Sequence, residues 1–229
     1  MEKRVIILTK SDKNGGYCVA GIDVNTGNFI RLVSEDENSN YALSDNDLIY
    51  DDERTYVEPM DIVNVQLKGK QNSWYQPENY IINDEYYFLK VGTASKNELR
   101  DYLMEEEYIF YNSQNYIDNI ELRNQLEKYS LVLFRVDELK MWRDKFKDGR
   151  IIASFIYNNE EYRFIKITDH ILTEKYYDEV VSCDPRPYTL YNPILIMSLA
   201  PQHTDGRHYK LIANIIEEDI IERANEDDI

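Results

Sequence analysis

The chain has 229 residues and a formal net charge of -17, and hydrophobic residues make up 43% of it. This hydrophobic share excludes a wholly disordered chain, and 20 Tyr, 7 Phe and 2 Trp favour sheet, because aromatic side chains pack well on pleated surfaces. Two cysteines, Cys18 and Cys183, are too few for a disulfide framework or a zinc cluster.

The first third of the chain predicts short β-strands. Its opening, MEKRVIILTK, has one short apolar run, too short for a signal peptide or a membrane span. We therefore expect no membrane partner and a place in the reducing cytoplasm. The runs GYCVAGIDV and NFIRLVS flank a turn of Asn25, Thr26 and Gly27, and DIVNVQLKG follows an acidic loop. Short strands joined by tight turns are typical of a small barrel, which we assign to residues 1–95.

The middle of the chain predicts helix. Ser95 and Glu98 have the spacing of a capping box, in which each side chain accepts a hydrogen bond from a free amide at a helix start. Apolar residues then recur near helical spacing, and a second helix is expected over Asn115–Tyr129. We assign residues 96–129 to a helical connector.

The last part returns to strands, in SLVLFRV, RIIASFIYNNEEYRFIKIT, PILIMSLA and HYKLIANII. Asn158 and Asn159 mark a turn, because asparagine tolerates positive φ. After this turn, strand alternation predicts Tyr162 and Phe164 on one face and Arg163 on the other. We assign residues 130–216 to a second barrel and 217–229 to an acidic tail.

Three stretches resemble the dual OB-containing domain family of prokaryotic conflict and defence systems. They are VIILTKSDKNGGYCVAGIDVNTGNFIRLVS, MDIVNV followed by QPENY, and SLAPQHTDGRHYKLIA. The resemblance covers nearly the whole chain, and it is weakest from Asn97 to Tyr129. It implies a mainly β fold with minor α, in which a helical segment joins two OB-like β-barrels, and a role in sensing nucleic acid or a nucleotide. OB barrels bind such ligands with aromatic side chains for stacking and cations for phosphates.

The mouth of the first hairpin is one candidate binding group. Lys10 and Lys13 can contact phosphate there, and Tyr17 can stack on a base. The alternative is an ordinary polar hairpin loop.

Two further groups lie in the N-terminal barrel. Phe29 and Arg31 can sandwich a base through a cation–π contact, or Arg31 can cover an apolar stem on the surface. Gln76 and Asn79 carry the paired donors and acceptors that bind a base edge, unless their loop only caps the barrel.

The most basic window of the chain runs from residue 140 to 150 and has a net charge of +3. Its candidate ligand contacts are Trp142, Arg143, Lys145, Lys147 and Arg150. Cations mixed with aromatic residues suit a groove that follows a nucleic-acid backbone, and the alternative is a solvated loop.

The late hairpin supplies the last group, Arg207, His208 and Lys210. Alternation places His208 and Lys210 on one face and Tyr209 on the other, so we expect an exposed Lys210 and a buried Tyr209. The alternative for His208 is a hydrogen-bonding structural role.

The negative charge is concentrated in two segments. Glu35–Asp61 has ten acidic residues and one basic residue, and 217–229 has seven and one. Such blocks are usually solvated, and the rest of the surface is left free to bind a polyanion. An alternative function follows from the same blocks, namely a subunit that docks onto a basic partner protein.

Enzyme motifs are weak in this sequence. The three histidines form no metal-binding pair at helical spacing, and no phosphate-binding glycine loop is present. Asp137, Glu138 and Lys140 match the acid-x-lysine half of a metal-dependent nuclease, but the one tempting upstream acid, Asp61, belongs to the other β unit. We therefore expect no catalysis and no cofactor. The function predicted is a recognition module that binds single-stranded nucleic acid or a nucleotide-like ligand for a partner effector protein.

Overall fold

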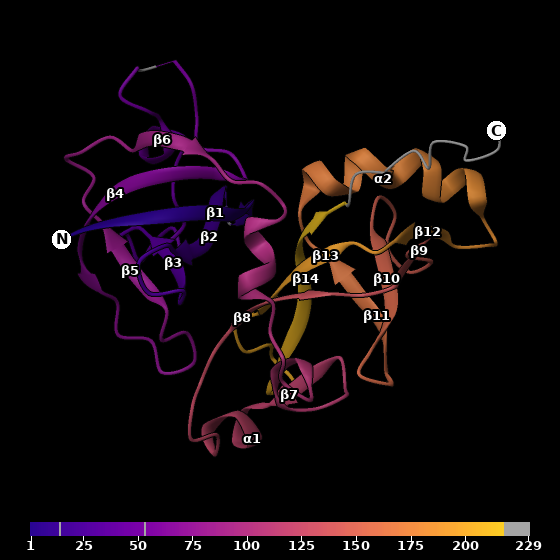
Figure 1. The fold of residues 1–229 in the computed structure, drawn as a ribbon. Helices are drawn as coiled ribbons and strands as arrows, with labels where there is room; N and C mark the ends of the chain where they lie inside the picture. The colour runs from indigo at the N-terminus through magenta and orange to yellow at the C-terminus, as the bar shows by residue number, and fades with distance from the viewer. Residues whose placement is uncertain (14, 53, 218–229) are drawn as a thin grey trace, which may run out of the picture.

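The computed structural model describes residues 1–13, 15–52 and 54–217. Its first half is a closed five-stranded barrel (Figure 1). Its strands are β1 (Glu2–Lys13), β2 (Gly16–Asp23), β3 (Phe29–Val33), β4 (Asp61–Lys70) and β5 (Asn79–Ile82). They pair in the order β1-β2-β3-β5-β4, and β4 pairs back with β1 to close the ring. β3 and β5 run parallel. A short strand, β6 (Leu89–Thr93), also pairs with β4, and the acidic segment contains the 3₁₀ helix η1 (Asn46–Leu48).

Alternation along the strands forms the core of this barrel. Val63, Val65 and Leu67 of β4 point inward, as DIVNVQLKG predicts. The barrel closes tightly around them, since a Cβ at Gly21 of β2 would lie 2.0 Å from the carbonyl oxygen of Ile6. Glycine at position 21 is therefore what allows β2 to approach β1 so closely.

The second half is a larger sheet with the same strand order. Its strands are β8 (Leu131–Arg135), β9 (Glu138–Arg143), β10 (Ile151–Tyr157), β11 (Glu160–Ile167), β12 (Tyr188–Tyr191), β13 (Ile194–Leu199) and β14 (Arg207–Ile216). The path β9-β10-β11-β14-β13-β8 begins and ends on strands that only two residues separate in the chain, so it returns on itself. β11 and β14 run parallel, as β3 and β5 do. The prediction of a mainly β fold with two OB-like units is confirmed.

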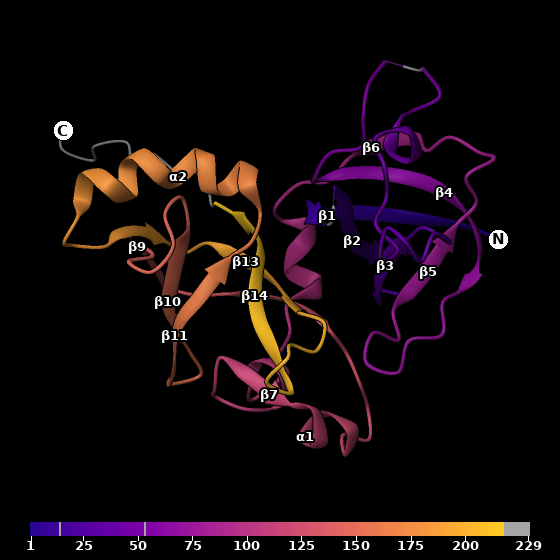
Figure 2. The same ribbon diagram turned by 180° about the vertical axis from the view of Figure 1, so that it is seen from behind.

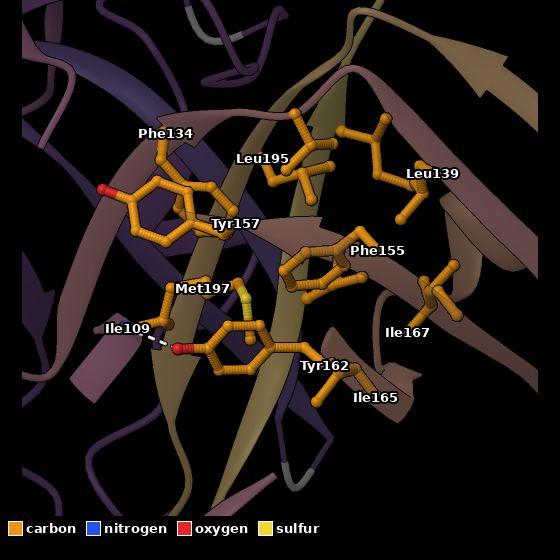
Figure 3. Close-up of a cluster of buried hydrophobic side chains, with 14 of the residues drawn as sticks. Ile109, Phe134, Leu139, Phe155, Tyr157, Tyr162, Ile165, Ile167, Leu195 and Met197 are labelled. Atoms are coloured by element: carbon orange, nitrogen blue, oxygen red, sulfur yellow. Dashed lines mark hydrogen bonds between the residues drawn. The ribbon is translucent and has the colours of Figure 1, made fainter. Parts of the chain in front are cut away.

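The core of the second unit is rich in aromatic residues (Figure 3). Phe155 and Tyr162 stack with their ring centroids 5.4 Å apart, and Phe134 lies 5.6 Å from Phe155. The Tyr162 hydroxyl accepts a hydrogen bond from the Ile109 amide at 3.0 Å, drawn as the dashed line. Tyr162 thus holds the connecting segment against the barrel that follows it.

The connecting segment is helical only in short pieces. It contains the 3₁₀ helices η2 (Glu98–Tyr102) and η3 (Ile109–Tyr111), the strand β7 (Tyr116–Asp118) and the five-residue helix α1 (Asn119–Arg123). The predicted capping box forms, with the Ser95 amide 2.6 Å from Glu98 Oε2, but it starts a 3₁₀ turn. The long helix expected over Asn115–Tyr129 is wrong, because Ile117 is buried in a strand that pairs with His208 of β14.

One helix was missed in the sequence. α2 (His170–Cys183) follows β11 and packs Leu172, Tyr176 and Val180 onto the second core. Asp169 caps it by accepting a hydrogen bond from the Leu172 amide at 2.8 Å. This cap and the four-residue apolar spacing were the available signals.

Within the described ranges, no helix is long and apolar enough to cross a membrane. The predicted acidic tail lies outside the described residues from position 218 onward, and the domain boundaries at 95 and 129 stay predictions.

The two barrels lie side by side and share a dry contact, here called the interface core (Figures 1 and 2). Its buried members come from both barrels and the connector: Ile6, Leu8, Ile22, Ala94, Leu99, Leu133, Ile194, Ile196 and Ile216. Asn214 of β14 also donates a hydrogen bond to the Leu8 carbonyl at 2.6 Å. The barrels are therefore joined by packing as well as by the chain.

A buried charge network crosses the same boundary. Arg31 of β3 is 2% exposed, and its Nη1 donates to Glu78 at 3.2 Å and to the Ser130 hydroxyl of the second half at 2.9 Å. Ser130 also donates to Glu78. The expectation that Arg31 lies on the surface and contacts a ligand there does not fit this burial, because its guanidinium is needed to neutralise Glu78.

Replacing Arg31 by methionine should therefore destabilise the whole protein. Arg31→Met leaves the Glu78 carboxylate buried without its cation, and such a loss costs about 3–5 kcal/mol. Urea unfolding monitored by tyrosine and tryptophan fluorescence measures it. Arg4→Met, at an exposed position of the otherwise largely buried β1, is the matched control and should change stability by less than about 0.5 kcal/mol. Equal effects of the two substitutions would contradict a structural role for the network.

The late hairpin is also structural, and its face assignment from sequence is wrong. Lys210 is 1% exposed, and its Nζ donates to the carbonyls of Ile109 at 2.5 Å and Asn112 at 2.6 Å. Burial lowers the pKa of Lys210 to about 7. Tyr209 is only half-buried, and its hydroxyl donates to Asp205 at 2.7 Å. Lys210 is buried because β7 pairs with β14 and brings the Ile109–Asn112 loop over its side chain.

Lys210→Met should lower the unfolding free energy by about 1–3 kcal/mol for each carbonyl that loses its donor. Tyr209→Phe removes one exposed hydrogen bond and should cost no more than about 1 kcal/mol. Thermal unfolding followed by circular dichroism gives both values. A larger loss of unfolding free energy in Tyr209→Phe than in Lys210→Met would instead support the original expectation of an exposed Lys210 and a buried Tyr209.

Candidate functional site

The hairpin mouth of the first barrel holds its cations in local contacts. Lys10 forms an ion pair with Glu58 at 2.8 Å and lies 5.2 Å from the centroid of the Tyr17 ring. A hydrogen bond to Asp45 raises the pKa of the Tyr17 hydroxyl, and burial lowers the pKa of Lys13. The structure thus brings Lys10 and Tyr17 together, but it uses both in contacts within the barrel.

The next two candidate groups are largely buried. Phe29 packs against the interface core, and Arg31 donates to Asn79 Oδ1 at 3.1 Å. The Asn79 amide donates in turn to Gln71 at 2.6 Å and lies 3.4 Å from Gln76 Oε1. Their hydrogen-bonding groups are directed at one another, so no base edge is within easy reach of Arg31 or Asn79.

The third buried group is the late hairpin. His208 is fully buried, its Nδ1 lies 2.9 Å from the Ala200 carbonyl, and burial lowers its pKa. The rings of Trp74 and Tyr75 from the first barrel pack on it, with centroids 5.8 and 5.1 Å away. Arg207 lies 4.0 Å from the centre of the Tyr116 ring. The contacts of Trp74 and Tyr75 with His208 thus join the two halves of the protein, whereas Arg207 contacts β7 and stays partly exposed.

The basic window is the candidate that the fold leaves open. The outer face of β9, β10 and β11, together with the loop after β9, lines a groove of about 1010 Å³ that we call the outer groove. Strands β9 and β10, which contribute to its lining, lie on the side of the second barrel away from the first (Figures 1 and 2). Trp142, Arg143 and Lys145 line the groove, whereas Lys147 and Arg150 do not. The structure therefore divides the predicted basic window into groove residues and loop residues.

Exposed aromatic side chains flank the outer groove. Phe146 is 100% exposed in the loop, and Phe164 of β11 is 64% exposed. Ile156 of β10 lies between the outer strands and is also exposed. Sequence reasoning missed Phe164, Ile156 and Arg163 as site residues, because only the pairing of β10 with both β9 and β11 brings them to the basic window. Exposed rings in a groove are the stacking surfaces that single-stranded nucleic acids use.

A β-bulge in β11 creates this arrangement. Ala153 faces Ile165 and Phe155 faces Tyr162, so Ser154 alone stands opposite both Arg163 and Phe164. Phe164 has φ +58, a left-handed conformation that is costly for a residue with a bulky side chain. The bulge corrects the predicted alternation: Tyr162 points into the core, while Arg163 and Phe164 are both exposed in the groove. Bulges commonly redirect side chains beside functional sites.

Charges of both signs line the outer groove in equal number. The basic residues are Lys140, Arg143, Lys145 and Arg163, and the acidic residues are Asp137, Glu138, Asp144 and Glu161. Lys140 Nζ lies 2.8 Å from Glu138 Oε2, and this hydrogen bond raises the pKa of Lys140. Arg163 likewise pairs with Glu161 and lowers the pKa of its carboxyl group. The groove can therefore contact phosphate at some positions and donors such as hydroxyl groups at others.

The corresponding face of the first barrel is covered. Ile6 of β1 and Ile22 of β2 are paired across that face, and both belong to the interface core. Strands β8, β13 and β14 of the second unit pack there through Leu133, Ile196 and Ile216. Among the residues that the structure describes, the face of the first barrel is covered and that of the second is left open to a ligand.

The chain was compared with known protein families, curated proteins and solved structures. The family model described as the dual OB-containing domain matches residues 3–215. No curated protein matches the chain. Among solved structures, a crystal structure of the tetrameric p202 HIN2 is similar to 96% of this chain and 92% of its own, with 12% sequence identity and a TM-score of 0.31. Because the family model spans both barrels and the segment between them, the chain belongs to the dual OB-containing domain family.

Proposed function

We propose that this protein is a non-catalytic recognition module that binds single-stranded nucleic acid or a nucleotide-like ligand in the outer groove. The observation that carries the proposal is the pair of exposed rings, Phe146 and Phe164, beside the cations Arg143 and Lys145. Stacking on aromatic rings and contacts from cations are the two interactions by which OB barrels hold single strands. Phe164 lies on a bulged strand with a strained φ of +58°, and this supports a binding role, because such backbone strain concentrates at functional sites.

The arrangement of acidic residues supports a role in binding rather than in catalysis. Lys140 of the nuclease-like triplet is paired with Glu138, and Asp61 of the first barrel accepts a hydrogen bond from Tyr50 and pairs with Lys90. Among the residues that the structure describes, no three His, Cys, Asp or Glu side chains gather where they could hold a metal ion. The acid that the triplet lacks is therefore engaged elsewhere.

The biological setting is part of the same proposal. The family resemblance supports a role in a prokaryotic conflict or defence system, with the ligand sensed in the cytoplasm on behalf of a partner effector protein. The acidic segment Glu35–Asp61 belongs to the first barrel, away from the outer groove, so ligand and partner can be held at different places.

Phe164→Gly should separate binding from stability. Loss of one stacked base costs about 1–3 kcal/mol, which is at least a fivefold loss of affinity for a short single-stranded oligonucleotide. Thermal stability should not fall, because glycine adopts positive φ without strain. Fluorescence anisotropy and a melting curve measure the two effects. Ile120→Ala, 75% exposed on α1, is the control and should bind as the unmodified protein does. Unchanged affinity in Phe164→Gly would place the ligand elsewhere.

The salt dependence of binding should distinguish two neighbouring lysines. Lys145→Ala should flatten the slope of log affinity against log salt by about 0.7, because one phosphate contact is lost. Lys147→Ala should leave the slope unchanged, since Lys147 does not line the groove. Titrations of one oligonucleotide between about 50 and 200 mM salt measure both slopes. An equal change in the two variants would point to general attraction by the loop.

A further inference from the structure

The outer groove has one basic end and one acidic end. Ile156 of β10 pairs with Glu161 of β11, and Glu138 of β9 directly precedes Leu139, which pairs with Phe155, so the two carboxylates belong to the same end of the sheet. The next row holds Lys140, Ser154 and the bulge, and Trp142 lies beyond it opposite Ile152. Arg143 ends β9, about 17 Å from Glu138 at about 3.3 Å per residue, and Asp144 and Lys145 follow it in the loop. Asp137 adds a further carboxylate to the acidic end.

The acidic end is unsuited to a phosphate but suited to hydroxyl groups. Lys140 contacts Glu138 through Oε2, and Arg163 contacts Glu161 through Oε2, so each pair holds its carboxylate in place by one oxygen. The other oxygen of each is an acceptor only, which suits a sugar hydroxyl as donor. Asp137, Glu138 and Glu161 are three carboxylates at this end, and only two cations, Lys140 and Arg163, offset them, so a phosphate of a continuing strand would meet a net negative charge.

We propose, on the basis of the function proposed above, that the outer groove holds the last nucleotide of a strand rather than its interior. The phosphate on the 5′ side of that nucleotide lies at Arg143 and Lys145, its base stacks on Phe164, and its free sugar hydroxyls donate to Glu138 and Glu161. The groove volume of about 1010 Å³ lies at the upper end of the range of about 300–1,000 Å³ that encloses single small ligands.

Two kinds of ligand present this combination of a phosphate and free sugar hydroxyls. The 3′ end of a single strand and a free nucleoside 5′-monophosphate both present one phosphate on the 5′ side and free hydroxyls on the 3′ side. Competition by adenosine 5′-monophosphate against a labelled strand distinguishes them. Competition at concentrations similar to the strand's own dissociation constant identifies the free nucleotide as sufficient, and competition only at concentrations at least 100-fold higher identifies the strand end.

The test compares three single strands of one sequence: linear with a 3′ hydroxyl, linear with a 3′ phosphate, and circular. The 3′ phosphate and the circle should each weaken binding at least tenfold, and a 5′ phosphate should change it less than twofold. In Glu138→Gln/Glu161→Gln, the penalty for the 3′ phosphate should shrink to less than threefold. Glu174→Gln, exposed on α2, is the control and should keep the full penalty.

The outcomes separate this inference from the function on which it rests. Equal binding of the circular and linear strands overturns the terminal-nucleotide proposal while nucleic-acid binding stands. An undiminished 3′-phosphate penalty in the double variant likewise removes Glu138 and Glu161 as its cause. If no strand or nucleotide binds even at low salt, the proposed function itself is wrong, and the inference falls with it.

Discussion

Arg31 connects the two halves of this protein in an environment from which water is excluded. Its guanidinium lies between Glu78 of the first barrel and Ser130 at the entrance to the second. Arg31 Nε and Glu78 Oε2 have no hydrogen-bond partner among the described residues, so the pair carries a desolvation cost. The surrounding interface core offsets that cost through apolar burial. The charge network has a demanding geometry and the apolar contact does not, so the network fixes how the barrels are oriented.

Because the orientation of the barrels is fixed, equivalent faces of the two differ in whether they are covered or exposed. Both have the same strand order, with a parallel pair between the third and fourth strands of the path. In the first, the outer face of the first strands is covered by β8, β13 and β14 of the second. In the second, the equivalent face remains open and lines the outer groove. Within the described part of the chain, one copy of this surface is therefore covered and the other is accessible.

The outer groove combines strain with balanced charge. Holding Phe164 in a left-handed conformation costs about 1–3 kcal/mol, and the rigid pairing of β10 with both neighbours sustains it. Pairing Lys140 with Glu138 and Arg163 with Glu161 offsets part of the negative charge at the acidic end of the groove. Affinity must then come from stacking and from placed polar contacts more than from general attraction to a polyanion, which favours selectivity over strength.

The sequence alone determined the mainly β architecture, because alternation and turn residues act locally. Val63, Val65 and Leu67 point inward as their spacing predicts, and Asn158 and Asn159 take the positive φ expected of them. The capping box at Ser95 also formed, but it starts only a 3₁₀ turn. The separate helix predicted over Asn115–Tyr129 is wrong, since the strand pairing of Ile117 is a long-range contact.

Tertiary structure decided which polar residues are buried and which are exposed. Arg31 and Lys210 lie on ordinary alternating strands, and nothing in their local sequence shows that Ser130 or the Ile109–Asn112 loop will cover them. The groove likewise depends on β9, β10 and β11 lying side by side and on a bulge that turns Phe164 outward. Periodicity reports the face of a strand, whereas burial and site geometry depend on partners that are distant in the chain.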